Sequence, residues 1–135
     1  MKKNRTHSRD SRVTKRIPYP TELLKHSAMA TLVSPGPLVV LSGVAGQSRE
    51  TGEVPEGITA QLEMACQQAL ESLKAAGSSS DKVFKIVTYF SELEDIPTII
   101  AIRRKHFRMY ATTTIRVAGF ARPGMRVELD IWATL

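Results

Sequence analysis

The sequence is poor in cysteine and has no long apolar run. Its single cysteine, Cys66, excludes a disulfide framework within the chain, so we expect a reducing compartment and a cytoplasmic protein. No stretch approaches the ~18–20 apolar residues of a membrane-spanning helix, so no membrane partner is expected. The three histidines, His7, His26 and His106, are scattered without metal-ligand spacing. No glycine-rich phosphate loop is present, so neither a metal nor a cofactor is expected.

The net charge of +6 is concentrated at the N-terminus. Residues 1–16 carry seven of the nineteen Lys and Arg residues and one of the thirteen acidic residues, which leaves the remaining 119 residues neutral. We predict a basic flexible tail over 1–16, because this segment is nearly devoid of apolar residues, and a single domain over 17–135. The tail is either a solvated extension or a contact for the phosphates of RNA or of another anionic surface.

The apolar periodicity predicts an α+β fold with two helices and four or five strands. An apolar stripe spaced by three and four residues predicts a helix over 58–76, ended by Gly77. Asp95 is expected to cap a second helix, with Ile96, Ile99, Ile100 and Phe107 buried. The basic residues 103–106 would complement the dipole at its end. The expected strands are a weak one within 23–33, then 38–44, 82–90, 112–118 and 126–133.

Two of these strands are apolar on both alternating faces. Two helices cover only one face of a sheet, yet residues 38–44 and 82–90 require burial on both. The chain offers no further element for the second face. We therefore expect another copy of the same chain to cover it.

The last strand alternates between an apolar and a polar face. Glu128 and Asp130 lie on the polar face, toward the expected subunit interface. A carboxylate in such a place needs a partner or has a perturbed pKa, which makes Glu128 the best candidate for general acid/base catalysis. The alternative is a structural ion pair with Arg116 or Arg126.

Several segments in order resemble the Rid family, the reactive intermediate deaminases also called YjgF-like proteins. They are VVLSG at 39–43, TGEVPEGITAQ at 51–61, LKAAGSSSDKVFKIVTYF at 73–90, ELEDI at 92–96 and VELDIWA at 127–133. The resemblance implies a chorismate-mutase-like fold, a mixed β-sheet with two helices on one face. It also implies a homotrimer with small-molecule clefts between subunits. The activity implied is hydrolysis of enamines and imines, such as 2-aminoacrylate, to ammonia and a keto acid.

The same resemblance indicates site residues. The family's catalytic glutamate falls on Glu128, and its Ser-Gly pair on Ser42 and Gly43. The arginine that clamps the substrate carboxylate falls on Thr112, or on Thr113 if the register shifts by one. The tyrosine of a Gly-Pro-Tyr segment is also absent, since Ser-Ala-Met stands at 27–29.

The missing arginine leaves the function open. Losing a bidentate contact to a buried carboxylate costs about 2–5 kcal/mol, enough to remove ordinary 2-aminoacrylate deamination. Arg116 and Arg108 are the candidates to replace it, and Arg116 is favoured because it shares a face with Thr112 and Thr114. We expect either a diverged imine or enamine hydrolase not specialised for 2-aminoacrylate, or a non-catalytic trimer that binds a metabolite. Contact with RNA through the tail is the third hypothesis.

Overall fold

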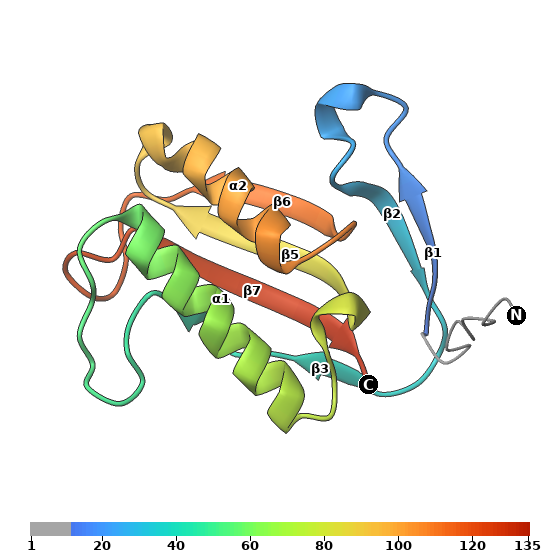
Figure 1. Ribbon diagram of the computed structural model, residues 1–135, viewed down its shortest axis with the longest axis horizontal. Helices are drawn as coiled ribbons and strands as arrows, with labels where there is room; N and C mark the ends of the chain where they lie inside the picture. Colours follow the sequence, from blue (N-terminus) through green and yellow to red (C-terminus); the bar gives the residue numbers. More distant parts are fainter. Residues whose placement is uncertain (1–11) are drawn as a thin grey trace, which may run out of the picture.

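The computed structural model describes residues 12–135 and begins with a β-hairpin. Strands β1 (Val13–Pro18) and β2 (Ala28–Val33) pair antiparallel, with a short 3₁₀ helix, η1 (Glu22–Leu24), in the connection. The hairpin stands beside the main body (Figure 1). Arg16 ties it there by donating hydrogen bonds to the carbonyl oxygens of Met109, Asp81 and Val83.

This hairpin corrects the predicted boundary of the basic tail. Val13 is buried and pairs with Val33, so residues 13–16 belong to a strand rather than to a flexible tail. The prediction rested on the scarcity of apolar residues and on charge, and it failed at 13–16 because Val13 is buried in the hairpin and Arg16 donates to backbone carbonyl oxygens of the main body. Residues 1–11 lie outside the described residues, and the predicted RNA contact lies there with them.

The main sheet is mixed, with the strand order β3-β7-β5-β6. Its strands are β3 (Leu38–Val40), β5 (Val83–Phe90), β6 (Ala111–Arg116) and β7 (Val127–Thr134), and the two-residue β4 (Val44–Ala45) also pairs with β7. Strands β5 and β6 are parallel, and the other pairs are antiparallel. The single strand predicted over 38–44 is therefore wrong: two short strands flank an irregular segment at 41–43.

Both helices pack on the same face of this sheet, as predicted (Figure 1). Most of the apolar stripe of α1 (Ile58–Ala75) is buried, whereas Leu70 is half-buried and Ala76 is exposed. Gly77 follows the helix in the left-handed conformation (φ +80°) that favours glycine. The inward residues of β7, Val127, Leu129, Ile131 and Ala133, complete the core beneath the helices. No helix within residues 12–135 is long and apolar enough to cross a membrane.

The second helix, α2 (Ile96–His106), differs from the prediction in two ways. Ile99 and Phe107 are buried as expected, but Ile100 is 40% exposed and Ile102 is buried instead. The larger difference is Arg103, which was expected only to complement the helix dipole together with residues 104–106 and instead is buried, at 5% exposed. Parallel strands need a crossover, and α2 provides it by connecting β5 to β6 across the helix-covered face.

The opposite face of the sheet is not covered by any helix among the described residues. Paired residues on neighbouring strands share a face, so the register identifies its members. One row across the strands consists of Ala45, Glu128, Tyr89 and Ile115. Apolar side chains on this uncovered face are well exposed: Val40 at 59% and Ile115 at 41%.

Candidate functional site

Glu128 lies on the uncovered face in contact with Gly43. A β-carbon placed on Gly43 would collide with the carboxylate of Glu128, so only glycine admits the side chain in this position. Gly43 and its neighbour Ser42 belong to the irregular segment at 41–43 between β3 and β4, and β4 pairs with β7 at Glu128 itself. Three of the predicted site residues, Ser42, Gly43 and Glu128, therefore come together within one chain.

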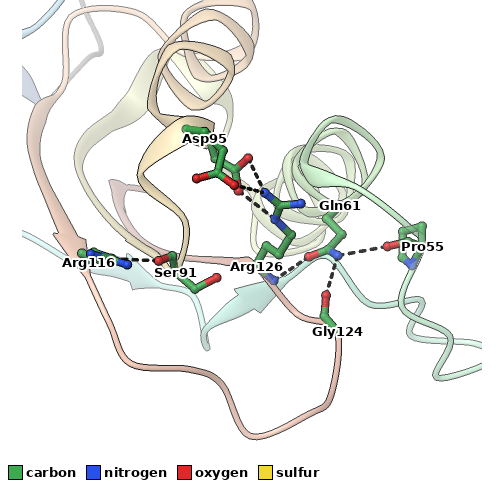
Figure 2. A network of polar contacts seen from close by, with 8 residues as sticks. Pro55, Gln61, Ser91, Asp95, Arg116, Gly124 and Arg126 are labelled. Atoms are coloured by element: carbon green, nitrogen blue, oxygen red, sulfur yellow. Dashed lines mark hydrogen bonds and ion pairs between the residues drawn. The ribbon is translucent and has the colours of Figure 1, made fainter.

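Glu128 has no counter-ion in the described part of the chain. Both arginines proposed for a structural ion pair are engaged elsewhere (Figure 2). Arg126 forms a two-pronged pair with Asp95, at 2.9 Å and 2.7 Å, and Arg116 donates to the carbonyl oxygen of Ser91 at 2.9 Å. The ion-pair interpretation is thus wrong for these two partners. The partly exposed Glu128 carboxylate remains available to another molecule.

Arg126 is held from two sides, and this fixes the start of β7. Its guanidinium meets Asp95, while its backbone N–H donates to the side-chain oxygen of Gln61 at 2.8 Å (Figure 2). The amide nitrogen of Gln61 donates in turn to the carbonyl oxygens of Pro55 and Gly124. Asp95 stands at the N-cap position, but its side chain makes no capping bond, contrary to the prediction, because it pairs with Arg126. This network positions Glu128, two residues along the chain.

Two further polar pairs lie on the uncovered face near Glu128. The hydroxyl of Tyr89 donates to Asp130 at 3.0 Å, and this hydrogen bond raises the pKa of Tyr89, with the nearby charges of Asp130 and Glu128 adding to the effect. Thr113 lies one row further along and accepts a hydrogen bond from the ammonium of Lys85 at 2.8 Å. The uncovered face thus carries carboxylate, phenol and ammonium groups among apolar side chains.

Thr112 and Arg116 lie on the opposite, helix-covered face. Thr112 pairs with buried Ile86, and Arg116 pairs with buried Phe90. Within one chain the sheet therefore separates both residues from Glu128. Arg116 does share a face with Thr112, but its guanidinium is bonded at Ser91, so it does not replace the missing arginine there.

The guanidinium that does reach Thr112 belongs to Arg103. Its Nη1 atom donates to the hydroxyl oxygens of Thr88 at 2.7 Å, Thr112 at 3.1 Å and Thr114 at 3.2 Å. Arg103 was not among the predicted site residues, because it belongs to a run of four basic residues. A signal was nevertheless present: Arg103 follows Ile99 by four positions and so lies on the buried stripe of α2.

A cavity of about 310 Å³ opens beside Arg103, between α2, the start of β6 and the tip of the hairpin. Its walls include Leu23 and Leu24 of η1 and Ile96 and Ile100 of α2. Ser27, the first residue of the Ser-Ala-Met segment at 27–29, also lines it. Arg108 does not line this cavity but a separate depression. Among residues 12–135, no cluster of three or more His, Cys, Asp or Glu side chains is placed to hold a metal ion.

Comparison with known proteins identifies the family. The model of the family described as endoribonuclease L-PSP matches residues 23–135. A mouse protein, 2-iminobutanoate/2-iminopropanoate deaminase, is 30% identical over 95 residues, which cover 68% of this chain and 70% of the mouse protein. The chain belongs to the Rid/L-PSP family.

Solved structures of Rid proteins share the fold. A Rid-family protein of unknown function from Yersinia pestis superposes with a TM-score of 0.79 at 21% identity, covering 90% of this chain and 98% of that one. RidA from an Antarctic Psychrobacter gives a TM-score of 0.70 at 24% identity, covering 94% and 100%. The Rid fold predicted from the sequence, a mixed sheet with two helices on one face, is confirmed.

Proposed function

We propose that this Rid-family chain hydrolyses an imine or enamine and that Glu128 handles the protons of the reaction. The observation that carries the proposal is the Glu128 carboxylate itself. It lies partly exposed on the uncovered face, seated on Gly43, with no cation paired to it within residues 12–135. The name of the mouse relative, an imine deaminase, supports the same chemistry.

A carboxylate in this position suits each step of such a reaction. An enamine first takes a proton on carbon and becomes an iminium ion. Glu128 accepts a proton from water as the water oxygen bonds to the C=N carbon, which gives a carbinolamine. Returning that proton to nitrogen lets the C–N bond break and ammonia leave. The hydroxyl of the carbinolamine then gives its proton to Glu128 and becomes the carbonyl oxygen, and this proton replaces the one taken up by the enamine carbon, so that the imine and one water become a carbonyl compound and ammonia.

We also propose that three copies of the chain assemble through their uncovered faces and form clefts at Glu128. Val40 and Ile115 are 59% and 41% exposed on this face, and Trp132 lies between their strands. Apolar side chains exposed together favour burial against a partner. Such burial would also withdraw Glu128 from bulk water, where a carboxylate is a weak base.

The test is release of ammonia and keto acid from a panel of 2-imino acids generated in the cuvette, with wild type, Glu128→Gln and Asp130→Asn side by side. We expect wild type to turn over at least one imine other than that derived from 2-aminoacrylate. Glu128→Gln should lose 10²- to 10⁴-fold in rate, in the range for a lost general acid/base. Asp130→Asn, a matched change on the same strand and face, should keep most of the rate.

A trimer that binds a metabolite without catalysis is the second candidate. The observation favouring it is Thr112, which stands where the resemblance places the arginine that clamps substrate. If wild type and Glu128→Gln release ammonia equally from every imine in the panel, the hydrolase proposal is wrong and this candidate replaces it.

A further inference from the structure

Glu128 shares the uncovered face with a second carboxylate and a phenol. Tyr89 of β5 pairs with Glu128 of β7, and Val87, two positions earlier, pairs with Asp130. Residues directly opposite each other on antiparallel strands have β-carbons roughly 5 Å apart, and a diagonal neighbour is within reach of an aromatic side chain. The Tyr89 hydroxyl takes this diagonal and donates to Asp130 at 3.0 Å. The phenol therefore starts opposite Glu128 and ends at Asp130.

The hydrogen bond to Asp130 decides what the phenol offers to a ligand. A hydroxyl has one proton to donate and two lone pairs with which it accepts. The bond to Asp130 uses that proton and, together with the charges of Asp130 and Glu128, raises the pKa of Tyr89, so the proton stays on the phenol at neutral pH. Donation to a carboxylate also polarises the hydroxyl and makes its oxygen a better acceptor. Tyr89 is therefore an acceptor for a ligand.

The charges around this phenol oxygen favour a cation. Neither Glu128 nor Asp130 forms an ion pair within residues 12–135. Lys85, on the same face of β5, directs its ammonium to the hydroxyl of Thr113 on the next strand, at 2.8 Å. A ligand group with positive charge and N–H donors therefore suits this place better than an anion does.

We propose that Tyr89 is a second catalytic residue of the Glu128 site and that its phenol oxygen accepts a hydrogen bond from the N–H of the protonated imine. The inference deepens the proposed function and rests on it, since it names the group that receives the positively charged nitrogen. No proton moves to or from Tyr89, and the proton transfers run through Glu128. A hydrogen bond is stronger when its donor is charged, so Tyr89 favours the iminium ion over the neutral imine.

The test is the rate of ammonia release by wild type, Tyr89→Phe and Tyr19→Phe with the imine that wild type turns over fastest. Tyr89→Phe removes only the hydroxyl and should lower kcat by about tenfold or more, the effect of a lost hydrogen bond to a charged group. Tyr19→Phe, a matched change in the hairpin connection, should keep the wild-type rate. An unchanged kcat in Tyr89→Phe would overturn the proposal.

The pH dependence separates this role from a structural tie between β5 and β7. Without the phenol oxygen, the bound imine holds its proton less tightly, and a neutral imine is attacked by water less readily. The loss of rate in Tyr89→Phe should therefore grow between pH 6 and pH 9, as protonation of the imine becomes limiting. A loss of the same size at every pH would indicate a structural role and would overturn the proposal.

Variants of Asp130 test the hydrogen bond that orients the phenol. Asp130→Asn keeps a side-chain oxygen that can accept the proton of Tyr89, so most of the rate should remain, as expected above. Asp130→Leu removes the acceptor at similar size and should lower kcat towards that of Tyr89→Phe. Equal rates in the two Asp130 variants would overturn the proposed role of the phenol.

A binding measurement covers the same contact without turnover. Acetamidinium is a planar cation whose nitrogens carry N–H donors, as in a protonated imine, whereas tetramethylammonium has the same charge and no N–H. In an NMR titration, wild type should bind acetamidinium more tightly than tetramethylammonium, by about tenfold or more. Tyr89→Phe should lose most of this preference. No preference in wild type, or the same preference in Tyr89→Phe, would refute the contact.

The hydrolase and the role of Tyr89 fail separately. Ammonia release that depends on Glu128 but is unchanged in Tyr89→Phe would refute this inference and leave the hydrolase standing. A preference for acetamidinium that depends on Tyr89, without any ammonia release that depends on Glu128, would refute the hydrolase and the catalytic role with it. The recognition of a nitrogen cation by Tyr89 would then stand alone.

Discussion

The carboxylate of Glu128 occupies the space that a β-carbon on Gly43 would fill. The two residues come from β7 and from the break between β3 and β4, and β4 pairs with β7 at Glu128. A glycine is required here by close approach alone, because Gly43 is not among the glycines with positive φ. The break in the strand and the orientation of the carboxylate therefore depend on each other.

Gly43→Ala should reveal this contact as a coupling in stability. The added methyl must displace the Glu128 carboxylate, and we expect a loss of about 1 kcal/mol in the free energy of unfolding. In a Glu128→Ala background the same change should be neutral or slightly stabilising, since the obstructing group is gone. Urea denaturation of the four proteins measures the coupling. Gly119→Ala, where an added β-carbon meets nothing within 4 Å, is the control; equal losses in both backgrounds would contradict the contact.

Val40→Asp should break the assembly without unfolding the chain. Val40 is 59% exposed on the uncovered face, so an aspartate there is hydrated in a single chain but would be buried between copies. Light scattering should give the mass of three chains for wild type and of one for the variant, with unchanged circular dichroism. Leu93→Asp, at a 55% exposed leucine outside this face, should remain a trimer. A single-chain mass for wild type would refute the assembly.

Asp95→Asn should destabilise the chain by about 2–3 kcal/mol. The Asp95 side chain is 4% exposed and that of Arg126 is 32% exposed, so the loss should fall below the ~3–5 kcal/mol of a fully buried pair. Glu94→Gln tests the neighbouring carboxylate, which is 73% exposed and 3.7 Å from Arg126, and should cost less than about 0.5 kcal/mol. Urea denaturation at pH 7 measures both. Equal losses of stability in the two variants would mean that the buried Asp95–Arg126 pair contributes no more than the exposed contact between Glu94 and Arg126.

Glu63 should give the chain an acid-sensitive contribution to stability. It accepts hydrogen bonds from Lys105 at 2.8 Å and His106 at 2.7 Å, linking α1 to α2, and these bonds, that of Lys105 first, lower its pKa. A lowered pKa in the folded state means that the contribution is present above the unfolded pKa, near 4.5, and is lost as the pH falls through the folded value. Because the side chain is 30% exposed, we expect less than about 1 kcal/mol.

The measurement compares Glu63→Gln with wild type by urea denaturation between pH 7 and pH 3. The difference should be constant from pH 7 to about pH 5 and shrink below pH 4.5. Glu71→Gln, at an exposed α1 carboxylate with no ion pair among the described residues, should match wild type throughout. If the stability difference between wild type and Glu63→Gln grows as the pH falls, the predicted lowering of the Glu63 pKa on folding is wrong.

Periodicity was enough to predict the helices and the inward face of β7, because burial of an apolar stripe leaves a mark every three or four residues, or every second one. It predicted neither the break after Val40 nor the pairing of Asp95. Both depend on residues far along the chain: Glu128 displaces any side chain at 43, and Arg126 draws Asp95 from its capping role. Local patterns do not contain such encounters.

The candidate site was predicted only in part, again because local patterns do not show which distant residues meet. Glu128 followed from alternation along one strand, and Ser42 and Gly43 followed from the resemblance. The separation of Thr112 and Arg116 from Glu128 required the register of three strands. Arg103 was not recognised because a run of basic residues is usually taken as solvent-exposed throughout. The helical period instead places Arg103 on the buried face of α2.

Arg103 and Thr112 are nine positions apart in the chain, yet the guanidinium of one lies 3.1 Å from the hydroxyl of the other. An alignment column records which residue a backbone position carries, but a ligand meets only the end of the side chain. Sorting Rid-like sequences by whether they have arginine in the strand would place this chain among those without one. Such a classification should compare the positions of the charged groups in space, because an arginine on a helix can place its guanidinium beside a strand position that carries no charge.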